Sequence, residues 1–401
     1  MSRRIVVLLS DLPLPFGNAA ARWYYVLLRG LVERGHRVTA FVVGPEGRRA
    51  AEVAELFPAP GYDVRLYDPP RRSGLFARLE SLRRPYSYPF GPDLRRDLHA
   101  ELARGFDVLH AELTWTGWLA LGHADRAVVN VHSLYQIDLS QTAAGSAVDR
   151  LRQLSVFRAE RALLRRFPTI LTLTPRLTDA VRRISPRSSV HTNPLGIDLS
   201  LYPFEPDGRP RGEPGPVVSL IGSFNWEPTL SAGRRLLTRL WPEIVRRVPD
   251  ARLQVVGRVA RAALGALATG PGVSVHEDVP DTIPYFRGTD VLLYAPGPAT
   301  GMKVKVLEAF ALGVPVVTNA DGVEGLPAAD GVHAGLAEDD AGLIDRTVAL
   351  LAAPARRARM RRDARALVEA HCSPGPVLDR LEAIHSEIAA RSATAPSGPP
   401  G

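Results

Sequence analysis

RIVVLLSDLPLPFGNAAARWYYVLLRGLVERGHRVTAFVV, residues 4–43, contains a strand, a loop, a helix and a second strand in that order. Residues 4–10 are a run of β-branched and leucine side chains, and the loop after them contains Gly17. Residues 19–34 have the apolar spacing of a helix, and residues 38–43 return to a strand pattern. This order predicts a βαβ unit of a parallel sheet, whose ligands bind at the carboxyl ends of the strands.

The alternation continues to about residue 190, and turn residues then cluster at 192–198. Prolines and glycines are dense at 203–216, which predicts a linker between two domains. The patterns before this linker predict strands at 62–67, 107–110, 127–132 and 169–173, and helices at 93–104, 146–167 and 176–184.

The same alternation repeats after the linker, so the second half is also expected to be a parallel α/β domain. Its patterns predict strands at 217–221, 252–256, 273–276, 291–294 and 314–318, and helices at 230–248, 281–288, 303–312, 340–353, 355–370 and 376–390. The fold class is α/β, with two Rossmann-like doubly wound domains facing across a cleft, where small molecules often bind. The expected boundaries are 1–196, 197–375, a terminal helix at 376–391 packing on the first domain, and a disordered tail at 392–401.

Composition and charge narrow the function classes. The 401 residues include one cysteine, Cys372, which excludes an internal disulfide and favours the cytoplasm. No apolar run is long enough for a signal peptide or a membrane span. The formal net charge of +8 suggests anionic partners such as nucleotides, phospholipid surfaces or nucleic acid. All basic residues are arginines except Lys303 and Lys305, so a compact ammonium group is expected to matter there.

Several common signatures are missing. The chain has no Gly-x-Gly-x-x-Gly after its first strand, no P-loop, no Gly-x-Ser-x-Gly and no His-Glu-x-x-His. Dehydrogenase, P-loop, serine hydrolase and zinc protease functions are therefore disfavoured. The acidic run 338–340 is interpreted as an exposed helix start and not as a metal motif, and no metal is expected.

The densest motif is PGPATGMKVKVLEAFALGVPVV, residues 296–317. A strand leads into a Gly/Pro loop and then a helix start, where free N–H groups and the positive helix end attract anions. Lys303 and Lys305 add charge there, and Glu308 follows on the helix where it can reach ligand hydroxyls, as acidic residues do for ribose. This arrangement would suit a diphosphate with an attached ribose.

This block is similar to the donor site of the retaining, nucleotide-sugar-dependent glycosyltransferases of family 4, which have the GT-B fold. Further landmarks of that family follow in order over nearly the whole chain: NPLGID at 193–198, GSFNWEP at 222–228, WP at 241–242, VGR at 256–258, VPD at 279–281 and GVEGL at 322–326.

The resemblance implies a role for each matching residue. Glu308 would bind the donor ribose, the backbone around Val279 the base, and the amides near Lys303 and Lys305 the diphosphate. His132 would lie near the donor sugar. The remaining donor-binding candidates are Gly17, Asn18, Ser223, Arg258, Met302 and Val304.

The chain departs from the family at two places. Thr300 stands where the family usually has an acidic residue, eight positions before Glu308. Ser223 and Glu227 stand near the usual Arg and Lys after the second domain's first strand. A subgroup of the family carries its cations in a Gly-x-Arg/Lys-x-Lys segment, so Lys303 and Lys305 are expected to neutralise the phosphates.

The expected activity is metal-independent transfer of a hexosyl-type sugar from a nucleoside-diphosphate sugar, with retention and no separate cofactor. The acceptor stays open among a natural product, a lipid-linked saccharide and a polysaccharide. A catalytically silent nucleotide-sugar-binding protein is the alternative, and His110 is a weaker substrate-contact candidate than His132. Basic and aromatic residues at 71–96 and a basic helix at 150–166 favour either peripheral membrane contact or a solvated face. Nucleic-acid binding is disfavoured because no binding module accompanies the charge.

Overall fold

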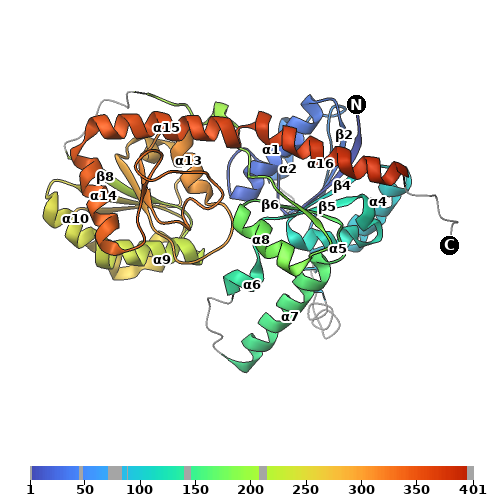
Figure 1. The fold of residues 1–401 in the computed structure, drawn as a ribbon, viewed down its shortest axis with the longest axis horizontal. Coiled ribbons are helices and arrows are strands. Elements are labelled where there is room, and N and C mark those ends of the chain that lie inside the picture. The colour runs from blue at the N-terminus through green and yellow to red at the C-terminus, as the bar shows by residue number, and fades with distance from the viewer. Residues whose placement is uncertain are drawn as a thin grey trace. The chain divides into compact units, whose positions relative to one another are not determined.

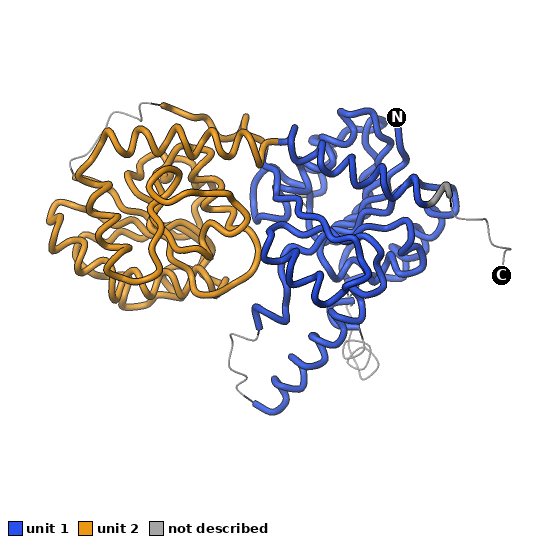
Figure 2. Tube along the Cα trace, in the orientation of Figure 1, with its two compact units in different colours: residues 1–197, 374–401 blue, residues 198–373 orange. Residues whose placement is uncertain are grey.

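The computed structural model describes residues 2–44, 48–70, 84–87, 89–139, 146–206 and 215–394, and it divides into two compact units. Unit 1 contains residues 1–197 and 374–401, and unit 2 contains residues 198–373 (Figure 2). Each unit is a parallel sheet with helices, drawn in Figure 1. The α/β fold with two Rossmann-like units, expected from the sequence, is confirmed.

Unit 1 contains a seven-stranded sheet in the order β3-β2-β1-β4-β5-β6-β7. All of its pairs are parallel, and the central strands are buried, as sheets covered on both faces require. The strands are β1 (Arg4–Leu9), β2 (Arg37–Val43), β3 (Asp63–Tyr67), β4 (Val108–Glu112), β5 (Ala127–Val131), β6 (Thr169–Thr172) and β7 (Ser189–Thr192).

The helices of unit 1 begin and end near the sequence signals. Asn18 caps α1 by accepting a hydrogen bond from the Ala21 N–H at 2.9 Å. The α-helices are α1 (Ala19–Glu33), α2 (Arg48–Leu56), α4 (Pro92–Ala103), α5 (Gly117–Ala120), α6 (Tyr135–Asp138), α7 (Ala147–Leu164), α8 (Pro175–Ile184) and α16 (Pro374–Thr394).

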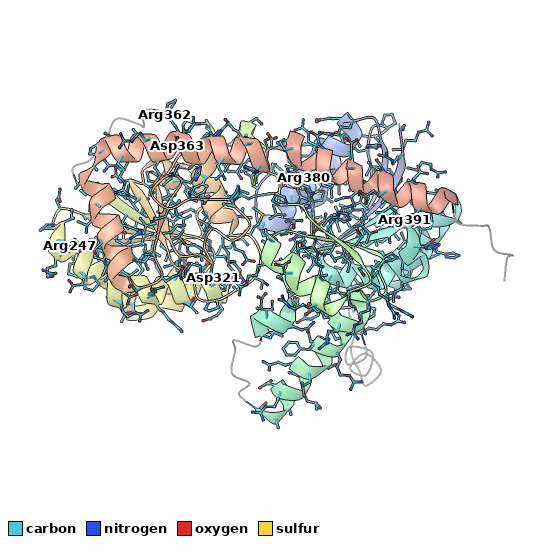
Figure 3. All side chains as sticks on the ribbon, viewed as in Figure 1. Arg247, Asp321, Arg362, Asp363, Arg380 and Arg391 are labelled. Carbon is cyan, nitrogen blue, oxygen red and sulfur yellow. The ribbon has the colours of Figure 1, made fainter. Side chains whose placement is uncertain are left out.

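The terminal helix α16 packs on unit 1 although it is the last segment of the chain. Its buried face consists of Val377, Leu378, Leu381, Ile384 and Ile388, at helical spacing. Polar contacts flank this face: Arg380 donates to Asn193 Oδ1 at 3.1 Å and Arg391 donates to Thr169, and both arginines are labelled in Figure 3.

Unit 2 contains a six-stranded sheet in the order β10-β9-β8-β11-β12-β13, again parallel throughout its pairs. The strands are β8 (Val217–Ile221), β9 (Arg252–Gly257), β10 (Val273–Glu277), β11 (Val291–Tyr294), β12 (Val316–Thr318) and β13 (Gly335–Leu336). The α-helices are α9 (Glu227–Arg235), α10 (Trp241–Arg247), α11 (Ala260–Leu264), α12 (Ile283–Arg287), α13 (Val304–Leu312), α14 (Asp340–Ala352) and α15 (Pro354–Cys372).

Some sequence expectations were wrong. The single helix expected at 230–248 begins at Glu227 and contains a π-helical turn, Leu236–Leu240, before Pro242 in α10, which lacks the N–H that a continuous helix requires. The terminal helix, expected to end at residue 391, continues to Thr394, and the rest of the expected tail, residues 395–401, lies outside the described residues. Strand β7 and helix α2 were missed, because each is short, with four and nine residues, and so offers few positions for a periodic pattern.

Candidate functional site

Helix α13 begins at the carboxyl end of the unit 2 sheet, after the loop that follows β11. Lys303 is its N-cap, with φ −97° and ψ 90°, and makes no side-chain cap. The first N–H groups of a helix have no partner within it, and they lie at its positive end. This end of α13 is therefore suited to an anion, as its sequence predicts.

The side chain of Lys303 is buried and closes its own loop. Its ammonium group donates to the carbonyl oxygens of Ala299, at 3.2 Å, and Gly301, at 2.5 Å. The Glu324 carboxylate lies 3.7 Å away and supplies a counter-charge from the loop after β12. Lys303 thus joins the loop before α13 to the loop after β12.

The ammonium group of Lys305 lies among residues that are distant in the sequence. It donates to the Thr229 hydroxyl of α9, and it stands 4.3 Å from the ring centroid of Tyr294 and 5.1 Å from that of Trp226. A Cβ atom on Gly222 would lie 2.7 Å from this nitrogen. Lys305 therefore brings its charge to the loop after β8, which contains Gly222 and Ser223.

The environment of Lys305 weakens its hold on the proton. Burial first, and then the charge of Lys303, lower its pKa to about 7, while the Glu308 carboxylate opposes the shift. A group at this pKa is easily returned to the charged form by a bound anion. Lys305 is thus suited to a ligand that carries negative charge.

Two glycines let the loops after β8 and β9 approach each other. Gly222 has φ +154° and Gly257 has φ +150°, and a Cβ on Gly257 would lie 1.7 Å from the Gly222 carbonyl oxygen. The Gly222 N–H donates to Val256 at 2.9 Å. Only glycine fits this crossing, which fixes the backbone beside Lys305.

Glu308 is 8% exposed and lies on α13, one helical turn beyond Lys305. The Tyr202 hydroxyl donates to its Oε1 at 3.4 Å. The sequence did not single out Tyr202, because no motif links a residue just before the Pro/Gly stretch to a helix 106 positions later. Glu308 therefore lies on the same helix whose amino end is suited to an anion.

The other unit 2 candidates occupy the loops at the same edge of the sheet. The Ser223 hydroxyl donates to Asn225 Oδ1 at 2.7 Å. Arg258 is exposed, and its backbone carbonyl accepts a hydrogen bond from the Phe224 N–H at 3.0 Å. Val279 is half-buried after β10. The remaining candidates, Met302 and Val304, lie at the start of α13, where Met302 is buried and Val304 half-buried. Thr300, in the loop before them, is also buried.

In unit 1, Gly17 and Asn18 have local structural tasks. Gly17 adopts φ +114°, and its carbonyl accepts a hydrogen bond from Arg22 Nε at 3.2 Å. Asn18 caps α1 and donates to Asp11. The left-handed backbone at Gly17 satisfies the condition for close approach of a ligand.

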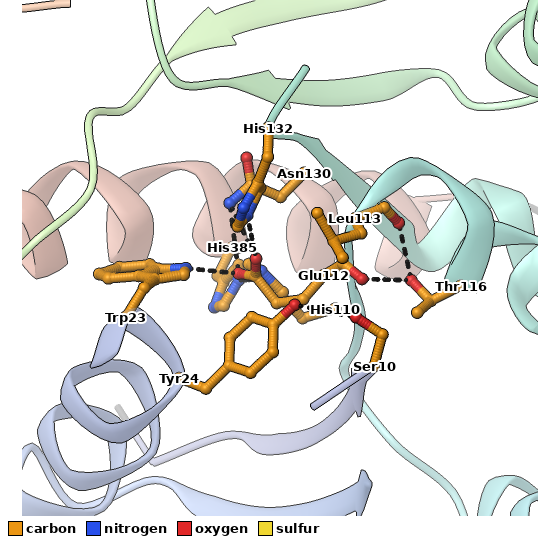
Figure 4. A network of polar contacts seen from close by, with 10 residues as sticks. All are labelled: Ser10, Trp23, Tyr24, His110, Glu112, Leu113, Thr116, Asn130, His132 and His385. Carbon is orange, nitrogen blue, oxygen red and sulfur yellow. Dashed lines mark hydrogen bonds and ion pairs between the residues drawn. The ribbon is translucent and has the colours of Figure 1, made fainter. Parts of the chain in front are cut away.

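His132, directly after β5, belongs to a polar network that the sequence did not reveal (Figure 4). Its Nε2 lies 2.7 Å from Oε2 of Glu112, which is fully buried at the end of β4. His110 Nε2 lies 2.7 Å from Oε1 of the same carboxylate. The strand expected at 107–110 continues to Glu112. A prediction with that longer strand would have placed Glu112 at its carboxyl end, where ligands bind in parallel sheets.

The acidic run 338–340 is a helix start, as interpreted from the sequence. Asp339 caps α14 by accepting the Gly342 N–H at 2.7 Å. Within the described ranges, no group of three His, Cys, Asp or Glu residues is arranged to hold a metal ion. In the same part of the chain, no helix is long and apolar enough to cross a membrane.

Comparisons with known families match both parts of the chain. Residues 20–201 match the family described as Glycosyltransferase Family 4, and residues 215–353 match the family described as Glycosyl transferases group 1. No curated protein matches the sequence.

Solved structures with the same architecture cover almost the entire chain. Sucrose-phosphate synthase from Thermosynechococcus elongatus aligns with a TM-score of 0.72 and 17% identity, covering 97% of this chain and 100% of that one. HepE from Anabaena, in complex with UDP and glucose, has a TM-score of 0.69, 13% identity and coverage of 96% and 100%. A glycosyltransferase from Rickettsia africae has a TM-score of 0.68, 11% identity and coverage of 97% and 99%. These likenesses establish the GT-B fold.

Proposed function

Taking the chain as a glycosyltransferase, which both family matches support, we propose that it moves a hexosyl-type sugar from a nucleoside-diphosphate sugar to an acceptor hydroxyl. The observation that carries this proposal is the position of Lys305. Its ammonium group meets the loop after β8 beside the amino end of α13, so a cation and the positive end of a helix lie at one place. A diphosphate is the ligand that such a site suits.

The donor's parts are assigned to residues by their places along the unit 2 sheet edge. The amides near Met302, Lys303 and Val304 hold the diphosphate, with Lys305 as counter-charge, and Glu308 accepts from the ribose hydroxyls. The base lies against the backbone at Val279, flanked by the loops of Ser223 and Arg258. In unit 1, His132 contacts the sugar, and Gly17 and Asn18 permit close approach of the first loop.

The reaction then proceeds with balanced charge. The bond between the sugar's anomeric carbon and the phosphate oxygen breaks, and its electron pair stays on the nucleoside diphosphate. Lys305 and the helix-end amides stabilise that developing charge. The acceptor oxygen forms the new bond on the same face, and its proton passes to the leaving phosphate. No metal takes part, and the configuration is retained.

A ligand screen followed by a turnover assay tests the function. HepE of Anabaena was solved with UDP and glucose, so UDP and UDP-glucose are the first probes, followed by the other nucleoside diphosphates. A bound nucleotide raises the midpoint of thermal unfolding. Donor hydrolysis or transfer by the purified protein then supports the enzyme, whereas binding without turnover on every acceptor tried supports the silent alternative.

Donor binding is expected to weaken as pH rises through neutrality. The Lys305 pKa is lowered to about 7 in the free protein, so the ammonium form that attracts phosphate is lost above that pH. The dissociation constant of the nucleotide sugar should rise by up to about tenfold per pH unit above neutrality. Isothermal titration between pH 6 and 9 measures this, because the donor's phosphodiester charges do not change there. Lys305→Met should show a flat profile, and an equally steep profile in that variant would contradict the assignment.

Peripheral membrane contact is proposed for helix α7. Three of the exposed large apolar side chains of the described residues lie on it: Val148 (61% exposed), Leu151 (67%) and Leu154 (53%). Exposed arginines follow along the same helix, including Arg158 and Arg161. Apolar residues beside arginines suit an anionic lipid surface. The basic residues expected to help at 71–83 lie outside the described residues. The protein is proposed to work in the cytoplasm, at the inner membrane face.

Vesicle sedimentation tests this contact. Replacing Leu151 and Leu154 with glutamate should reduce binding to phosphatidylglycerol vesicles at least about tenfold, because apolar burial is lost and negative charge is added. Val332→Glu, at a residue 44% exposed in unit 2, is the control and should bind as the parent does. Equal binding by both variants would show that α7 is a solvated face.

A further inference from the structure

We propose that Glu112 is a positioning residue that fixes the tautomer of His132, so that His132 Nε2 carries the proton toward Glu112 and Nδ1 is left as a hydrogen-bond acceptor for the sugar. This inference rests on the proposed contact between His132 and the donor sugar. It assigns a task to a buried carboxylate that the donor site itself does not use.

Glu112 accepts hydrogen bonds from four side chains (Figure 4). Trp23 Nε1 donates to Oε1 at 2.8 Å, and Asn130 Nδ2 lies 3.2 Å from both oxygens. The nitrogens of His110 and His132, each at 2.7 Å, complete the set. Burial by itself would raise the pKa of Glu112, but the hydrogen bonds from both histidines hold it well below its ordinary value. The carboxylate is therefore ionised.

An ionised carboxylate has no proton to give, so each histidine must donate to it. His132 must then carry a proton on Nε2, which leaves Nδ1 without a proton in the neutral ring. His110 likewise donates from Nε2, and its Nδ1 faces His385 Nε2 of α16 at 3.0 Å. Burial, followed by the charge of His110, lowers the pKa of His385 well below its ordinary value, so His385 is neutral.

His132 is the member of this network that a ligand can reach. The side chains of Glu112 and His110 are 0% exposed, whereas that of His132 is 10% exposed. Trp23, Asn130 and His385 are also buried. A purely structural network would have no reason to end in an accessible imidazole at the carboxyl end of a strand, which is where ligands bind in parallel sheets.

Glu112→Gln tests this assignment directly, because the hydrogen-bond donors around Glu112 determine how the glutamine amide will be oriented. Oε1 receives both Trp23 and His110, so the amide oxygen of the glutamine is expected to stay there. Its NH₂ group then takes the place of Oε2 and faces His132, which must accept through Nε2 and move its proton to Nδ1. His132→Gln identifies the His132 signals in ¹⁵N spectra of the imidazoles.

The expected result has two parts. In the parent protein His132 is the Nε2–H tautomer, and the nucleotide sugar shifts its Nδ1 signal. In Glu112→Gln it becomes the Nδ1–H tautomer, and kcat falls about 10- to 100-fold, as when the partner orienting a metal-bound histidine is removed. His36→Gln is the matched control, because His36 makes a similar 2.6 Å contact with Glu382 of α16 at the opposite sheet edge. It should leave the tautomer and kcat unchanged.

The spectra separate this inference from the proposed function. A parent His132 that is Nδ1–H, which requires no folded variant to detect, would overturn the inference. So would a tautomer switch in Glu112→Gln with unchanged kcat. Absence of any donor turnover in the parent, with His132 as Nε2–H and shifted by the nucleotide sugar, would instead count against the proposed function while supporting the assignment of Glu112.

Discussion

Replacing Lys305 with alanine should lower kcat/KM for the nucleotide sugar by roughly 30- to 1,000-fold, a loss of about 2–4 kcal/mol of transition-state stabilisation. The reason is that the charge on the leaving diphosphate grows during bond breaking, and a fixed cation in a site with little water stabilises it strongly. Steady-state kinetics measure the loss, and kcat should fall more than KM rises. Lys303→Ala should cause a loss of the same order, since Lys303 orders the loop before α13.

Two further variants sharpen the Lys305 result. Arg247→Ala removes an exposed cation of unit 2 that pairs with Asp345 at 2.6 Å, so it controls for the change in net charge and should keep full activity. Lys305→Arg keeps the charge but needs more room where Gly222 leaves little, so activity should be only partly restored. Unchanged turnover in Lys305→Ala would reject its role.

Gly257→Ala should unfold unit 2 or destabilise it by about 3 kcal/mol or more. The new methyl carbon would lie 1.7 Å from the Gly222 carbonyl oxygen, and the backbone would have to keep φ +150°, which alanine rarely adopts. The backbones of the loops after β8 and β9 would have to move apart. The hydrogen bond from the Gly222 N–H to the Val256 carbonyl would then be lost. Thermal unfolding followed by circular dichroism measures the effect.

Gly265→Ala separates the steric clash from the backbone strain, which are the two causes of the expected destabilisation in Gly257→Ala. Gly265 also has a positive φ, +54°, but a Cβ there meets nothing within 4 Å. It should cost about 1–3 kcal/mol, the backbone strain of an alanine at φ +54° and ψ −133°, and less than Gly257→Ala, which adds the steric clash. Similar unfolding midpoints for the two variants would show that the close crossing of the β8 and β9 loops is absent from the protein in solution.

Much of the fold follows from local sequence. The apolar run of β1, the cap at Asn18 and the helical spacing of α1 lie within a few dozen residues, and each expresses a preference that neighbouring residues decide. Repetition of that order in both halves predicts the two parallel sheets. The same local rules predict an anion site at the start of α13, because strand, glycine loop, lysines and helix follow one another directly.

The sequence alone also determined which residue types were available: two lysines among the basic residues, one cysteine, and glycines at the turns. Tertiary structure decided what they contact. Lys305 reaches Thr229, 76 positions earlier, and His110 meets His385, 275 positions later. Such pairs are formed by packing between distant elements, which leaves no periodic trace along the chain. For this reason the two lysines, two positions apart in sequence, differ in the protein: Lys303 closes its own loop, while Lys305 supplies the cation beside the loop after β8.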